Sequence, residues 1–465
     1  MSDLALITAI AQTVGAINGR VMFVGGYARD SVLRHRGKQI ISKDIDVEVY
    51  GVPMGKLQTI LATYGEINVV GASFGVIKLN NSNIDISIPR TDSKVGVGHK
   101  GFIVDTNPNM PVGEAARRRD FTINTIAIDV LTGEVIDEHG GLADIEAGLL
   151  RATDRQLFGD DPLRVLRAMQ LAARFNLQLT SQTIELCKQI DLGDLPPERI
   201  GEEWKKLLLL AQQPSIGLEV AKATGILAKL HPELDILGSI VQDQRWHPEG
   251  SVWEHTKLAV DIASIIIRRD ELNDKQSLEL MLAVLCHDLG KTTTTVMQDG
   301  SITSYGHEDA GCQPASDFLL QLSLPQYFQK VIPLLVANHM FPILNQKPSD
   351  AALRRLAQRL YPSNIQQLLR IAEADILGRT TEVKQTDHLG LIAEQADRLN
   401  VALNRTTPLI LGRDLIELGV PPGPVMGKLL DELFESQLAG SFTDHATGIE
   451  HVKRLLSSGD DSSEI

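Results

Sequence analysis

Two aspartates at a strand-like spacing are the first residues of this chain whose types and positions suggest chemistry. Asp44 and Asp46 open the segment 44–50, in which acidic and apolar residues alternate as in a strand with one polar face. Side chains two apart on a strand project from the same face, so the two carboxylates are expected side by side. Because such like charges repel unless a cation lies between them, the pair predicts a catalytic Mg²⁺ site beside substrate phosphates. A solvated strand face is the alternative.

Three further groups of residues would complete a site around such a metal. Asp85, on a second alternating segment, is a candidate to activate an attacking hydroxyl group. Gly25 and Gly26 follow the apolar strand 21–24 and open a predicted helix that carries Arg29. Glycines let the backbone approach a triphosphate, and the amides of a helix N-terminus favour the anion. An ordinary tight turn is the alternative for the glycines.

A run of arginines supplies the positive charge that a triphosphate requires. Arg118 and Arg119, preceded by a third arginine, are followed by Asp120 and Asn124. Two guanidinium groups near the carboxylate pair can hold the triphosphate and neutralise the leaving pyrophosphate. Basic runs are more often solvated, but one buttressed by Asp120 and Asn124 and followed by an apolar segment is less so.

A helix start further along the chain carries residues that can read a base. Asp161 is predicted at the N-cap and Pro162 at the first helical position, with Arg164 and Arg167 on one face of the helix. A carboxylate acceptor and a guanidinium donor fork together match the hydrogen-bonding edge of cytosine or adenine. The alternative is a capped helix with one salt bridge. A second charged helix is predicted over 198–206. Its charges can also be explained without a function, as ion pairs between residues four apart that stabilise the helix.

The second half of the chain carries an ordered set of possible metal ligands. His255, the pair His287 and Asp288, and then Asp375 fall on successive predicted helices. Imidazole and carboxylate groups from such helices can converge on a divalent metal. His307 and His339 could serve a second metal or bind phosphate. The alternative is a helical scaffold for RNA without metal.

The elements that must position these residues divide into a strand-rich head and a helical body. Strand patterns prevail from 21 to 137, with a hairpin predicted for 76–79 and 84–88, and helical periodicity prevails beyond Gly141. The N-terminal segment 1–17 predicts an amphipathic helix with Leu4, Ile7, Ala11 and Val14 on its apolar face. Proline-rich and glycine-rich breaks at 195–197, 247–250 and 421–424 mark boundaries. We expect a head at 1–148, a helical neck at 149–225, a metal-binding domain at 226–400 and a helical C-terminal element at 401–465.

Composition fits several domains and restricts the kind of partner. The 465 residues are 43% hydrophobic and 22% charged, as expected for a soluble globular protein. The net charge of −14 argues against broad coating of nucleic acid but not against binding one structured RNA along a basic strip. The residues of that strip are Arg151, Arg155, Arg164, Arg167, Arg174, Arg199, Lys205 and Lys206. Three cysteines without paired spacing predict a reducing, cytoplasmic setting, and the chain shows no membrane-spanning segment.

Taken in order, the motifs from about Val21 to Leu210 resemble the class II tRNA nucleotidyltransferases, the CCA-adding enzymes and their poly(A) polymerase relatives. These belong to the nucleotidyltransferase superfamily that includes DNA polymerase β. The resemblance implies an α+β fold: a polymerase-β-like head with a small mixed sheet, then an all-helical neck and body. It implies template-independent addition of CCA to the tRNA 3′ end from CTP and ATP, by metal-assisted attack of the 3′-hydroxyl on the nucleotide α-phosphate.

The resemblance also assigns residues. It implies that Asp44 and Asp46 bind Mg²⁺ and that Arg118, Arg119 and Asp120 hold ribose and triphosphate. The expected nucleotide-binding residues are Gly25, Gly26, Arg29, Arg118, Arg119, Asp120, Asn124, Asp161, Arg164 and Arg167. Residues 137–144, with Gly141, match a flexible element between head and neck, and Glu198, Arg199, Glu203 and Lys206 match a helix that steadies the neck. One departure is Asp160, where the family usually has Glu: a carboxylate to support Arg164 is kept, one methylene shorter.

The histidine set resembles that of the HD-superfamily metallophosphohydrolases. The resemblance makes His255, His287, Asp288 and Asp375 the ligands of a divalent transition metal or Mg²⁺. The glycine-rich and proline-rich segment 411–424 resembles the C-terminal element of related bacterial enzymes with HD domains. Three other functions stay open: a poly(A) polymerase or an enzyme adding only CC or only A, an HD phosphohydrolase whose head merely binds nucleotide, and an RNA-binding scaffold without activity.

Overall fold

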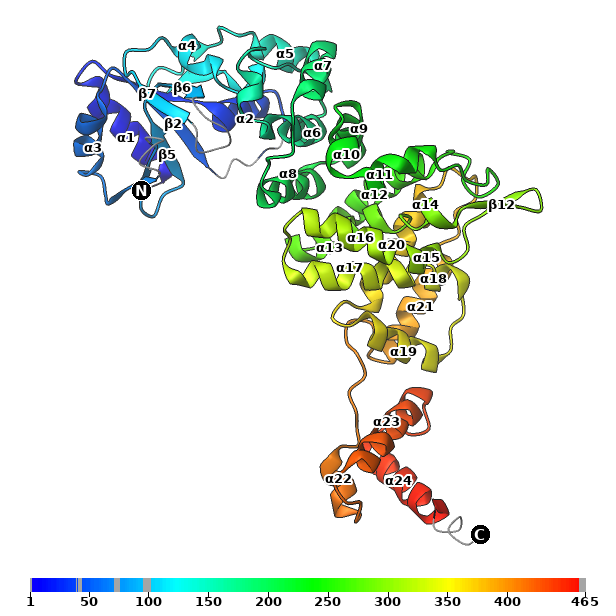
Figure 1. The fold of residues 1–465 in the computed structure, drawn as a ribbon. Helices are drawn as coiled ribbons and strands as arrows, with labels where there is room; N and C mark the ends of the chain where they lie inside the picture. The colour runs from blue at the N-terminus through cyan, green and yellow to red at the C-terminus, as the bar shows by residue number, and fades with distance from the viewer. Residues whose placement is uncertain (1, 39, 41–43, 71–75, 95–101, 460–465) are drawn as a thin grey trace. The chain divides into compact units, whose positions relative to one another are not determined.

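The chain divides into two compact units, Met1–Leu207 with Ile216–Leu230 and Leu208–Ser215 with His231–Ile465. The computed structural model describes residues 2–38, 40, 44–70, 76–94 and 102–459 (Figure 1). The first unit begins with a mixed α/β region and continues with helices, whereas the second unit is almost entirely helical. The predicted α+β class with a small mixed sheet is confirmed.

The α/β region builds the sheet on which the predicted carboxylates lie. Its helices are α1 (Asp3–Gly15), α2 (Gly25–His35), α3 (Met54–Leu61), α4 (Val112–Arg117), the 3-10 turn η1 (Thr122–Asn124) and α5 (Gly141–Ala147). Its strands are β1 (Arg20–Phe23), β2 (Ile45–Tyr50), β3 (Ile67–Val70), β4 (Val76–Leu79), β5 (Ile84–Ser87), β8 (Ala127–Asp129) and β9 (Val135–Ile136), with the pair β6 (Arg90–Lys94) and β7 (Phe102–Thr106) apart from them.

The sheet has the strand order β3-β4-β5-β2-β1-β8-β9. Strands β2 and β5 run parallel, and the other neighbours in the sheet are antiparallel. The predicted hairpin is confirmed as β4 and β5, whose connecting turn contains Asn81 in a left-handed conformation. The β2–β5 register places Asp46 directly opposite Asp85, so their side chains project from the same face of the sheet.

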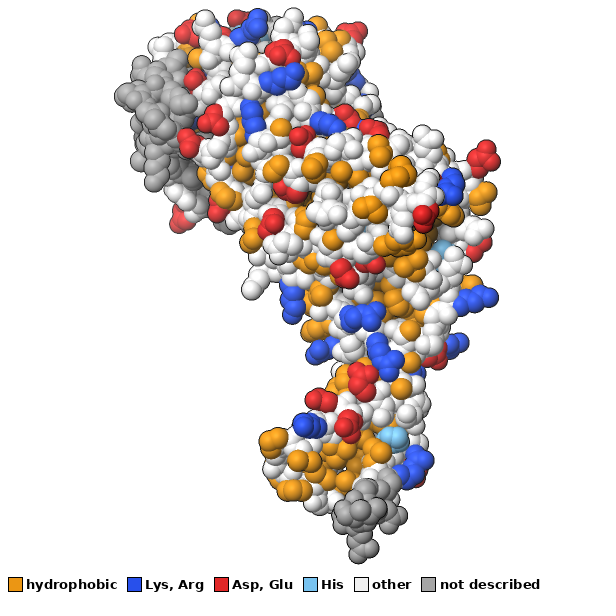
Figure 2. All heavy atoms as spheres, turned by 45° about the vertical axis from the view of Figure 1, so that its right-hand side comes forward, with side chains coloured by type: hydrophobic (Ala, Val, Ile, Leu, Met, Phe, Trp, Pro, Cys, Tyr) orange, Lys and Arg blue, Asp and Glu red, His pale blue; other side chains and the backbone are white. Residues whose placement is uncertain are grey.

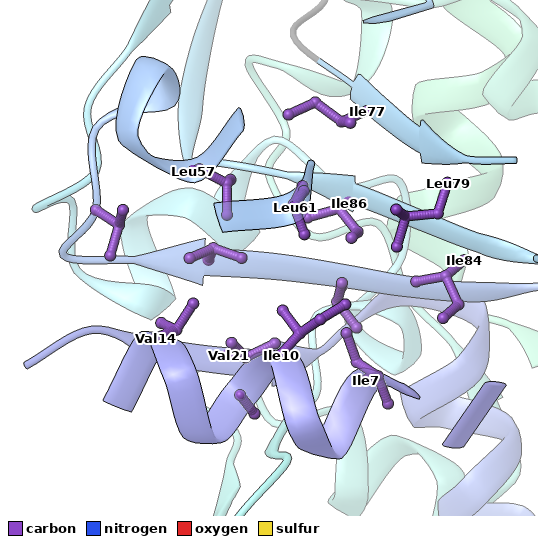
Figure 3. Close-up of a cluster of buried hydrophobic side chains, with 14 of the residues drawn as sticks. Ile7, Ile10, Val14, Val21, Leu57, Leu61, Ile77, Leu79, Ile84 and Ile86 are labelled. Carbon is purple, nitrogen blue, oxygen red and sulfur yellow. The ribbon is translucent and has the colours of Figure 1, made fainter. Parts of the chain in front are cut away.

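The opposite face of the sheet carries the hydrophobic core of this region (Figure 3). Ile45, Val47 and Val49 alternate with the acidic residues of β2 and face α1 and α3. The predicted N-terminal helix is confirmed as α1, and its buried face carries Ile7 and Val14 as expected. The alternation of β2 therefore separates a dry core on one face from carboxylates on the other.

The prediction for α1 was wrong at one position. Leu4 was expected on the apolar face, but its side chain is half exposed, and Ile10 fills the core instead. Leu4 lies in the first turn, where the helix extends past the edge of the packed cluster. Ile10 is fully buried and points into the cluster beside Val21 (Figure 3).

This difference gives a matched test of packing on one helix. Ile10→Ala is expected to lower the free energy of unfolding by about 2–5 kcal/mol, because it removes buried methyl groups and leaves a cavity. Leu4→Ala, on the same helix but exposed, should change it by about 0.5 kcal/mol or less. Urea denaturation followed by circular dichroism measures both. Equal effects of the two substitutions would contradict this account of the core.

From Leu149 to Leu230 the chain is mostly helical, apart from short two-residue strands. It comprises β10 (Leu149–Leu150), the 3-10 turn η2 (Phe158–Asp160), α6 (Leu163–Phe175), β11 (Gln178–Leu179), α7 (Ser181–Gln189), α8 (Pro197–Leu210), α9 (Pro214–Ala223) and α10 (Ile226–Leu230). The predicted start of α6 was wrong by one residue: Pro162 takes the N-cap position, and α6 begins at Leu163. Asp161 still accepts a hydrogen bond from the backbone amide of Leu163 at 3.2 Å, so its carboxylate serves the first turn from one position earlier.

The second unit is a helical body followed by a smaller helical element. Its elements are α11 (Pro232–Asp235), η3 (Ile236–Ser239), α12 (Val252–Arg269), α13 (Asp274–Cys286), α14 (Lys291–Thr294), β12 (Val296–Gln298), β13 (Ser301–Thr303), α15 (His307–Ala310), α16 (Cys312–Gln321), α17 (Gln326–Asn338), α18 (Phe341–Leu344), α19 (Asp350–Leu360), α20 (Ile365–Gly378), α21 (Asp387–Arg398), α22 (Gly412–Glu417), α23 (Pro424–Ala439) and α24 (His445–Gly459). Helices α12, α13 and α20 pack against one another, and α13 is buried all round from Ser277 to Cys286. A helix that is buried on every side belongs in the centre of a domain.

The C-terminal element has a small core of its own. That core consists of Ile410, Leu415, Met426, Leu433, Phe442 and Val452. The helical character predicted for this element is confirmed, with α22 and α23 joined by the glycine-rich and proline-rich stretch. Ile416 and Val425 remain exposed on this element, and hydrophobic side chains show on the face of it drawn in Figure 2. Within the described part of the chain, no helix has both the length and the apolar character needed to cross a membrane.

Candidate functional site

A pocket of about 400 Å³ in the first unit brings together all ten residues predicted to bind nucleotide. Basic side chains outnumber acidic ones in its lining. The lining residues are Gly25, Gly26, Arg29, Asp46, Arg118, Arg119, Asp120, Asn124, Asp161, Leu163, Arg164, Arg167, Gln170, Leu171, Arg174, Arg199 and Lys206. Of the predicted catalytic and nucleotide-binding residues of this unit, Asp44 and Asp85 lie outside this lining. An anion of the size of a nucleotide suits such a pocket.

Asp46, on β2, lines the pocket and has two other carboxylates as neighbours, those of Asp85 and Asp44. Burial raises the pKa of Asp46 above its ordinary value. Arg119 opposes that rise, whereas the neighbouring carboxylates of Asp85 and Asp44 add to it. Asp85 also forms an ion pair of 2.8 Å with Lys78. A carboxylate that has further carboxylates as neighbours is suited to a hard divalent cation, which prefers oxygen ligands.

Gly25 lies where these carboxylates meet the arginine run. Its φ of +62° is in the left-handed region, and α2 begins at this residue. A Cβ at this position would lie 2.8 Å from Nη1 of Arg119 and 3.4 Å from Oδ2 of Asp46. Glycine therefore serves two purposes here, because it permits the turn and leaves the space in which Arg119 approaches Asp46.

Glu48 is a residue of the site that the sequence analysis missed. It lies on β2 on the same face as Asp46 and is almost completely buried. Its Oε1 accepts hydrogen bonds from Nη2 of Arg118 at 2.7 Å and from Nη2 of Arg119 at 3.2 Å. Tyr50 donates its hydroxyl to Oε2 at 2.9 Å. Burial alone would raise the pKa of Glu48, but Arg119, Arg118 and Tyr50 hold it below its ordinary value, so the carboxylate stays charged and anchors both arginines.

Asp120 is buried, and both of its carboxylate oxygens accept hydrogen bonds. Its Oδ1 accepts hydrogen bonds from the backbone amide of Phe121 and the side chain of Asn124, both at 2.8 Å. Its Oδ2 accepts one from Nε of Arg167 at 2.6 Å. Against the effect of burial, which would raise it, Arg167, Asn124 and the Phe121 amide lower the pKa of Asp120 to about 2. Since protein donors engage both oxygens, the geometry favours a positioning role for Asp120 over direct contact with ribose or triphosphate.

This lowered pKa predicts how acid affects stability. A carboxyl whose pKa falls on folding contributes stability above its unfolded pKa of about 3.9, and that stability is lost as the pH falls toward about 2. The difference in unfolding free energy between the wild-type protein and Asp120→Asn should therefore shrink by about 1 kcal/mol between pH 6 and pH 3. Urea denaturation at the two pH values measures the difference. A constant difference would show that the carboxyl titrates alike in both states.

Arg29 was predicted to bind nucleotide, and the structure places its buried side chain in the wall of the pocket. Its side chain is buried, donates from Nε to Asp30 at 2.8 Å and from Nη1 to Asn124 at 2.7 Å, and stacks over Phe175 at 4.4 Å. These contacts join α2 to the 3-10 turn that follows the arginine run and to the end of α6. The structure thus supports Arg29 as a brace for the pocket.

The residues predicted to read the base lie at the start of α6. Arg164 donates from Nη1 to the carbonyl of Leu157 at 2.7 Å and from Nη2 to the carbonyl of Arg118 at 2.6 Å. Among the described residues these carbonyls, and not Asp160, hold the guanidinium in place. Asp161 faces Arg199 of α8, with 3.4 Å between Oδ2 and Nη2. The backbone carbonyl of Arg118 therefore helps to fix the guanidinium of Arg164, which is proposed to donate to the base.

The helix predicted to steady the neck and the segment predicted to be flexible both have defined contacts. Within α8, Lys206 pairs with the buried Glu203 at 2.7 Å. In the segment 137–144, Asp137 accepts hydrogen bonds from the backbone amides of Gly141 at 2.7 Å and Leu142 at 2.8 Å and so caps α5. A Cβ on Gly141 would lie 2.3 Å from the carbonyl oxygen of Thr122, so only glycine lets α5 pack against η1.

The second unit brings all four predicted metal ligands together in its interior. His255 lies on α12, His287 and Asp288 follow α13, and Asp375 lies on α20; all four are buried. His255 Nε2 is 3.1 Å from Asp375 Oδ1, and His287 Nε2 is 3.3 Å from Asp288 Oδ2. Neither Nε2 atom has a hydrogen-bond partner in the described residues, although both are fully buried. Buried, unbonded imidazole nitrogens beside carboxylates suit a divalent metal.

Residues that the sequence analysis did not single out surround these four. Glu249 accepts hydrogen bonds from Nδ1 of His255 and Nδ1 of His247, both at 2.9 Å. Arg379 contacts both oxygens of Asp375, at 3.0 and 2.9 Å. Burial would raise the pKa of Asp375, but Arg379 holds it well below its ordinary value. One helical turn separates the aspartate from this arginine, a spacing that could have indicated the pair.

Lys291 plays the corresponding role for Asp288. Its ammonium group lies 2.7 Å from Asp288 Oδ2 and 2.8 Å from the side-chain oxygen of Gln242. Burial opposes the charge of Asp288, yet His287 and Lys291 lower its pKa well below the ordinary value. A pocket of about 480 Å³ reaches Asp288 and Asp375 and is also lined by Lys291 and Arg379. Positive side chains beside a metal-binding cluster suit a phosphate ester.

Comparisons with known proteins agree with this arrangement. Residues 21–151 match the family model described as "Poly A polymerase head domain", and residues 177–237 match the one described as "Probable RNA and SrmB- binding site of polymerase A". The chain is 30% identical over 422 residues to the Multifunctional CCA protein of Xanthomonas campestris pv. campestris (strain B100), covering 88% of this chain and 96% of that relative.

Two solved structures illustrate the shared fold. The CCA-adding enzyme of Bacillus stearothermophilus, solved in complex with CTP, aligns with a TM-score of 0.67 over 98% of this chain and 100% of its own, at 19% identity. The CCA-adding enzyme of Thermotoga maritima, complexed with tRNA, aligns with a TM-score of 0.58 over 97% of this chain and 95% of its own, also at 19% identity. At this identity the two structures establish similarity of fold.

Proposed function

Because the chain belongs to the class II tRNA nucleotidyltransferases, the family of CCA-adding enzymes and their poly(A) polymerase relatives, we propose that it adds CCA to the 3′ end of tRNA from CTP and ATP. One observation carries the proposal for this chain. A single pocket joins the carboxylate of Asp46, the anchored pair Arg118 and Arg119, and the candidate base-reading residues Asp161 and Arg164. These are the parts that a polymerase without a template needs in one place.

The head residues provide the chemistry of nucleotidyl transfer. Asp44 and Asp46 would hold Mg²⁺, which neutralises charge on the phosphates when it is bound. Arg118 and Arg119, fixed by Glu48, hold the triphosphate. The 3′-oxygen of the primer forms a bond with the α-phosphorus while the bond to pyrophosphate breaks. Asp85, beside Asp46 on the neighbouring strand, accepts the proton of the attacking hydroxyl.

The neck residues select the base. Asp161 offers an acceptor and Arg164 a donor, which together suit the edges of cytosine and adenine. Fixed protein side chains that serve both bases replace a template strand. The basic residues that line the pocket beside them, Arg174 and Arg199 among them, extend the positive surface away from the reacting phosphate. We propose that this surface receives the tRNA acceptor end, in keeping with the RNA-binding family model that begins at residue 177.

Incorporation of labelled nucleotides tests the proposal. Purified protein with Mg²⁺ is given CTP and ATP, separately and together, on tRNA ending at the discriminator base, tRNA ending in CC, and an unstructured RNA. Addition of CCA to the first primer is the expected result. Addition of C alone, or of A only to the CC-ended primer, would make the enzyme a partial one. Long A tails on unstructured RNA would make it a poly(A) polymerase, and no incorporation by folded protein would refute the transferase.

A second activity is supported by the histidine cluster of the second unit. We propose that His255, His287, Asp288 and Asp375 form an HD-type site that hydrolyses phosphate esters. The observation that supports this assignment is that Nε2 of His255 and Nε2 of His287 are buried without a hydrogen-bond partner among the described residues. A divalent metal bound there would polarise the ester. Lys291 and Arg379 orient its carboxylate ligands and add positive charge toward the phosphate.

Two double variants separate the activities. His287→Ala with Asp288→Ala is expected to abolish hydrolysis of p-nitrophenyl phosphate and bis-p-nitrophenyl phosphate and to leave CTP incorporation unchanged. Asp44→Asn with Asp46→Asn should do the reverse. If both folded variants lost both activities, the assignment of two independent sites would be wrong.

The three unpaired cysteines, Cys187, Cys286 and Cys312, agree with the proposed cytoplasmic location of the enzyme.

A further inference from the structure

The side chain of Gln242 is buried in the second unit, and a neighbouring cation fixes which way its amide faces. Its exposed fraction is 7%. Nζ of Lys291 lies 2.8 Å from Oε1 of Gln242 and 2.7 Å from Oδ2 of Asp288. An ammonium group can only donate hydrogen bonds, so the amide atom that faces it must be the oxygen. Nε2 of Gln242 is therefore the other branch of the amide, with two N–H groups to donate.

These two N–H groups have no acceptor within the described part of the chain. Nε2 of Gln242 is buried and makes no hydrogen bond there. A buried donor without an acceptor is costly, and native structures rarely keep one unless a ligand or an ordered water completes it. Gln242 also lines the pocket of about 480 Å³ that reaches Asp288 and Asp375. The unused donors thus belong to the wall of the proposed hydrolytic site.

The backbone on either side holds Gln242 against this pocket. Val241 forms an isolated antiparallel bridge with Ser251, the N-cap residue of α12. On the other side of Gln242, the carbonyl oxygen of Asp243 accepts a hydrogen bond of 2.9 Å from the backbone amide of His247 and so closes a turn. Because the bridge and the turn flank Gln242, its side chain enters the pocket from a fixed stretch of backbone.

The charged groups around Nε2 select an anionic oxygen as its acceptor. Lys291 and Arg379 line the same pocket, and each pairs with a buried aspartate. A negative acceptor is stabilised by these cations, and a hydrogen bond to a charged acceptor is stronger than one to a neutral acceptor. A non-bridging oxygen of a phosphate ester has this charge and can accept from an amide.

We propose that Gln242 donates a hydrogen bond from Nε2 to a non-bridging phosphoryl oxygen of the substrate, with Lys291 holding the amide in the orientation that this contact needs. Gln242 is then a phosphate-binding residue that lies outside the histidine and aspartate set. The proposal rests on the proposed HD-type hydrolysis of phosphate esters.

Two substitutions separate donation to the phosphate from support of Lys291. Gln242→Glu keeps an oxygen for Lys291 but puts a second carboxylate oxygen where the donor was, and Gln242→Met is similar in size and offers neither group. Both are expected to lower kcat/KM for p-nitrophenyl phosphate by about 10- to 100-fold, mostly through KM, because that factor corresponds to one hydrogen bond to a charged group. The inhibition constant of inorganic phosphate should rise in parallel. Gln244→Glu and Gln244→Met, at an exposed glutamine of the same loop, should change neither value.

Three kinetic results would overturn the proposal. Impairment of Gln242→Met alone would mean that Gln242 only supports Lys291, and impairment of Gln242→Glu alone would mean that only the added charge acts. If neither variant were impaired, the Nε2 donors would bind water. The loss should also be of the same size with phenyl phosphate, whose leaving group is more basic. A larger loss with that ester would place the contact on the leaving oxygen and would contradict the assignment to a non-bridging one.

A nuclear magnetic resonance titration tests the contact without measuring activity. The wild-type protein is labelled with nitrogen-15 in its glutamines and loaded with Mg²⁺, and the side-chain signal of Gln242 is the one that disappears in Gln242→Glu or in Gln242→Met, whichever folds. Inorganic phosphate is expected to shift this signal and to leave the Gln244 signal in place. A Gln242 signal that stays unchanged at saturating phosphate would overturn the proposal. If the wild-type protein hydrolyses neither ester, the proposed HD activity fails, and the presence or absence of the shift alone decides the role of Gln242.

Discussion

Replacing Asp46 with asparagine is expected to lower the rate of nucleotide incorporation by about 1,000-fold or more, with the fold retained. Asparagine has the size of aspartate, so packing on β2 is kept while the negative charge is removed. Asp46 lies opposite Asp85 and lines the pocket beside Arg119, so no other carboxylate of the pocket occupies its place. Single-turnover incorporation of labelled CTP into tRNA that lacks CCA measures the effect.

The size and specificity of that loss are what test the assignment. Asp431→Asn, at an exposed aspartate of α23, is the control and should leave the rate unchanged. Hydrolysis of phosphate esters should also stay unchanged in Asp46→Asn, because Asp46 belongs to the first unit. A loss of less than about tenfold would mean that Asp46 does not hold the catalytic metal, since such a role is worth several kcal/mol.

Glu48→Ala is expected to reduce kcat/KM for CTP by about 100-fold and to destabilise the protein by about 3 kcal/mol. The substitution leaves Arg118 and Arg119 without the buried carboxylate that holds both guanidiniums at 2.7 and 3.2 Å. The two guanidinium groups then repel each other and are no longer held in place. They therefore no longer meet the triphosphate in a fixed position. Steady-state kinetics and urea denaturation give the two values.

Two matched variants identify the cause. Glu48→Gln keeps the size and the hydrogen-bonding oxygen but not the charge, and it should be impaired to an intermediate degree. Glu134→Ala removes an exposed glutamate that pairs with Arg20 at the surface and should change either value little. If Glu48→Ala destabilised the protein but left kcat/KM intact, Glu48 would serve only the packing of β2.

Much of the fold could be predicted because its signals are local. The alternation of β2, the hairpin of β4 and β5, and the apolar stripe of α1 each lie within a few residues of chain. The errors lie at element ends. Leu4 fits the stripe of α1 by spacing, but the first turn extends beyond the core. Pro162 suits the first helical position, yet it occupies the cap because α6 begins one residue later.

The site was less predictable, because its chemistry depends on contacts between distant segments. Glu48 continues the spacing of Asp44 and Asp46, and the sequence gives no sign that it meets two arginines about seventy residues later. Arg29 follows the glycine pair as a phosphate-binding residue would, but hydrogen bonds to Asp30 and Asn124 hold its guanidinium within the pocket wall. Residue types and order thus indicate the chemistry, whereas the three-dimensional contacts separate the residues that face the pocket from those that brace it.

Gly290, two residues after Asp288, packs so closely against the backbone of His307 and Gly311 that its lack of a side chain has a consequence at the level of the gene. All four glycine codons begin with two guanines, so any single-base change at either of those positions that still encodes an amino acid introduces a Cβ. That atom would lie 2.0 Å from the carbonyl oxygen of His307, a backbone atom that no change of side-chain rotamer moves away. Only silent changes at the third base are neutral to this contact, so heritable variation at this codon is expected to be almost entirely synonymous.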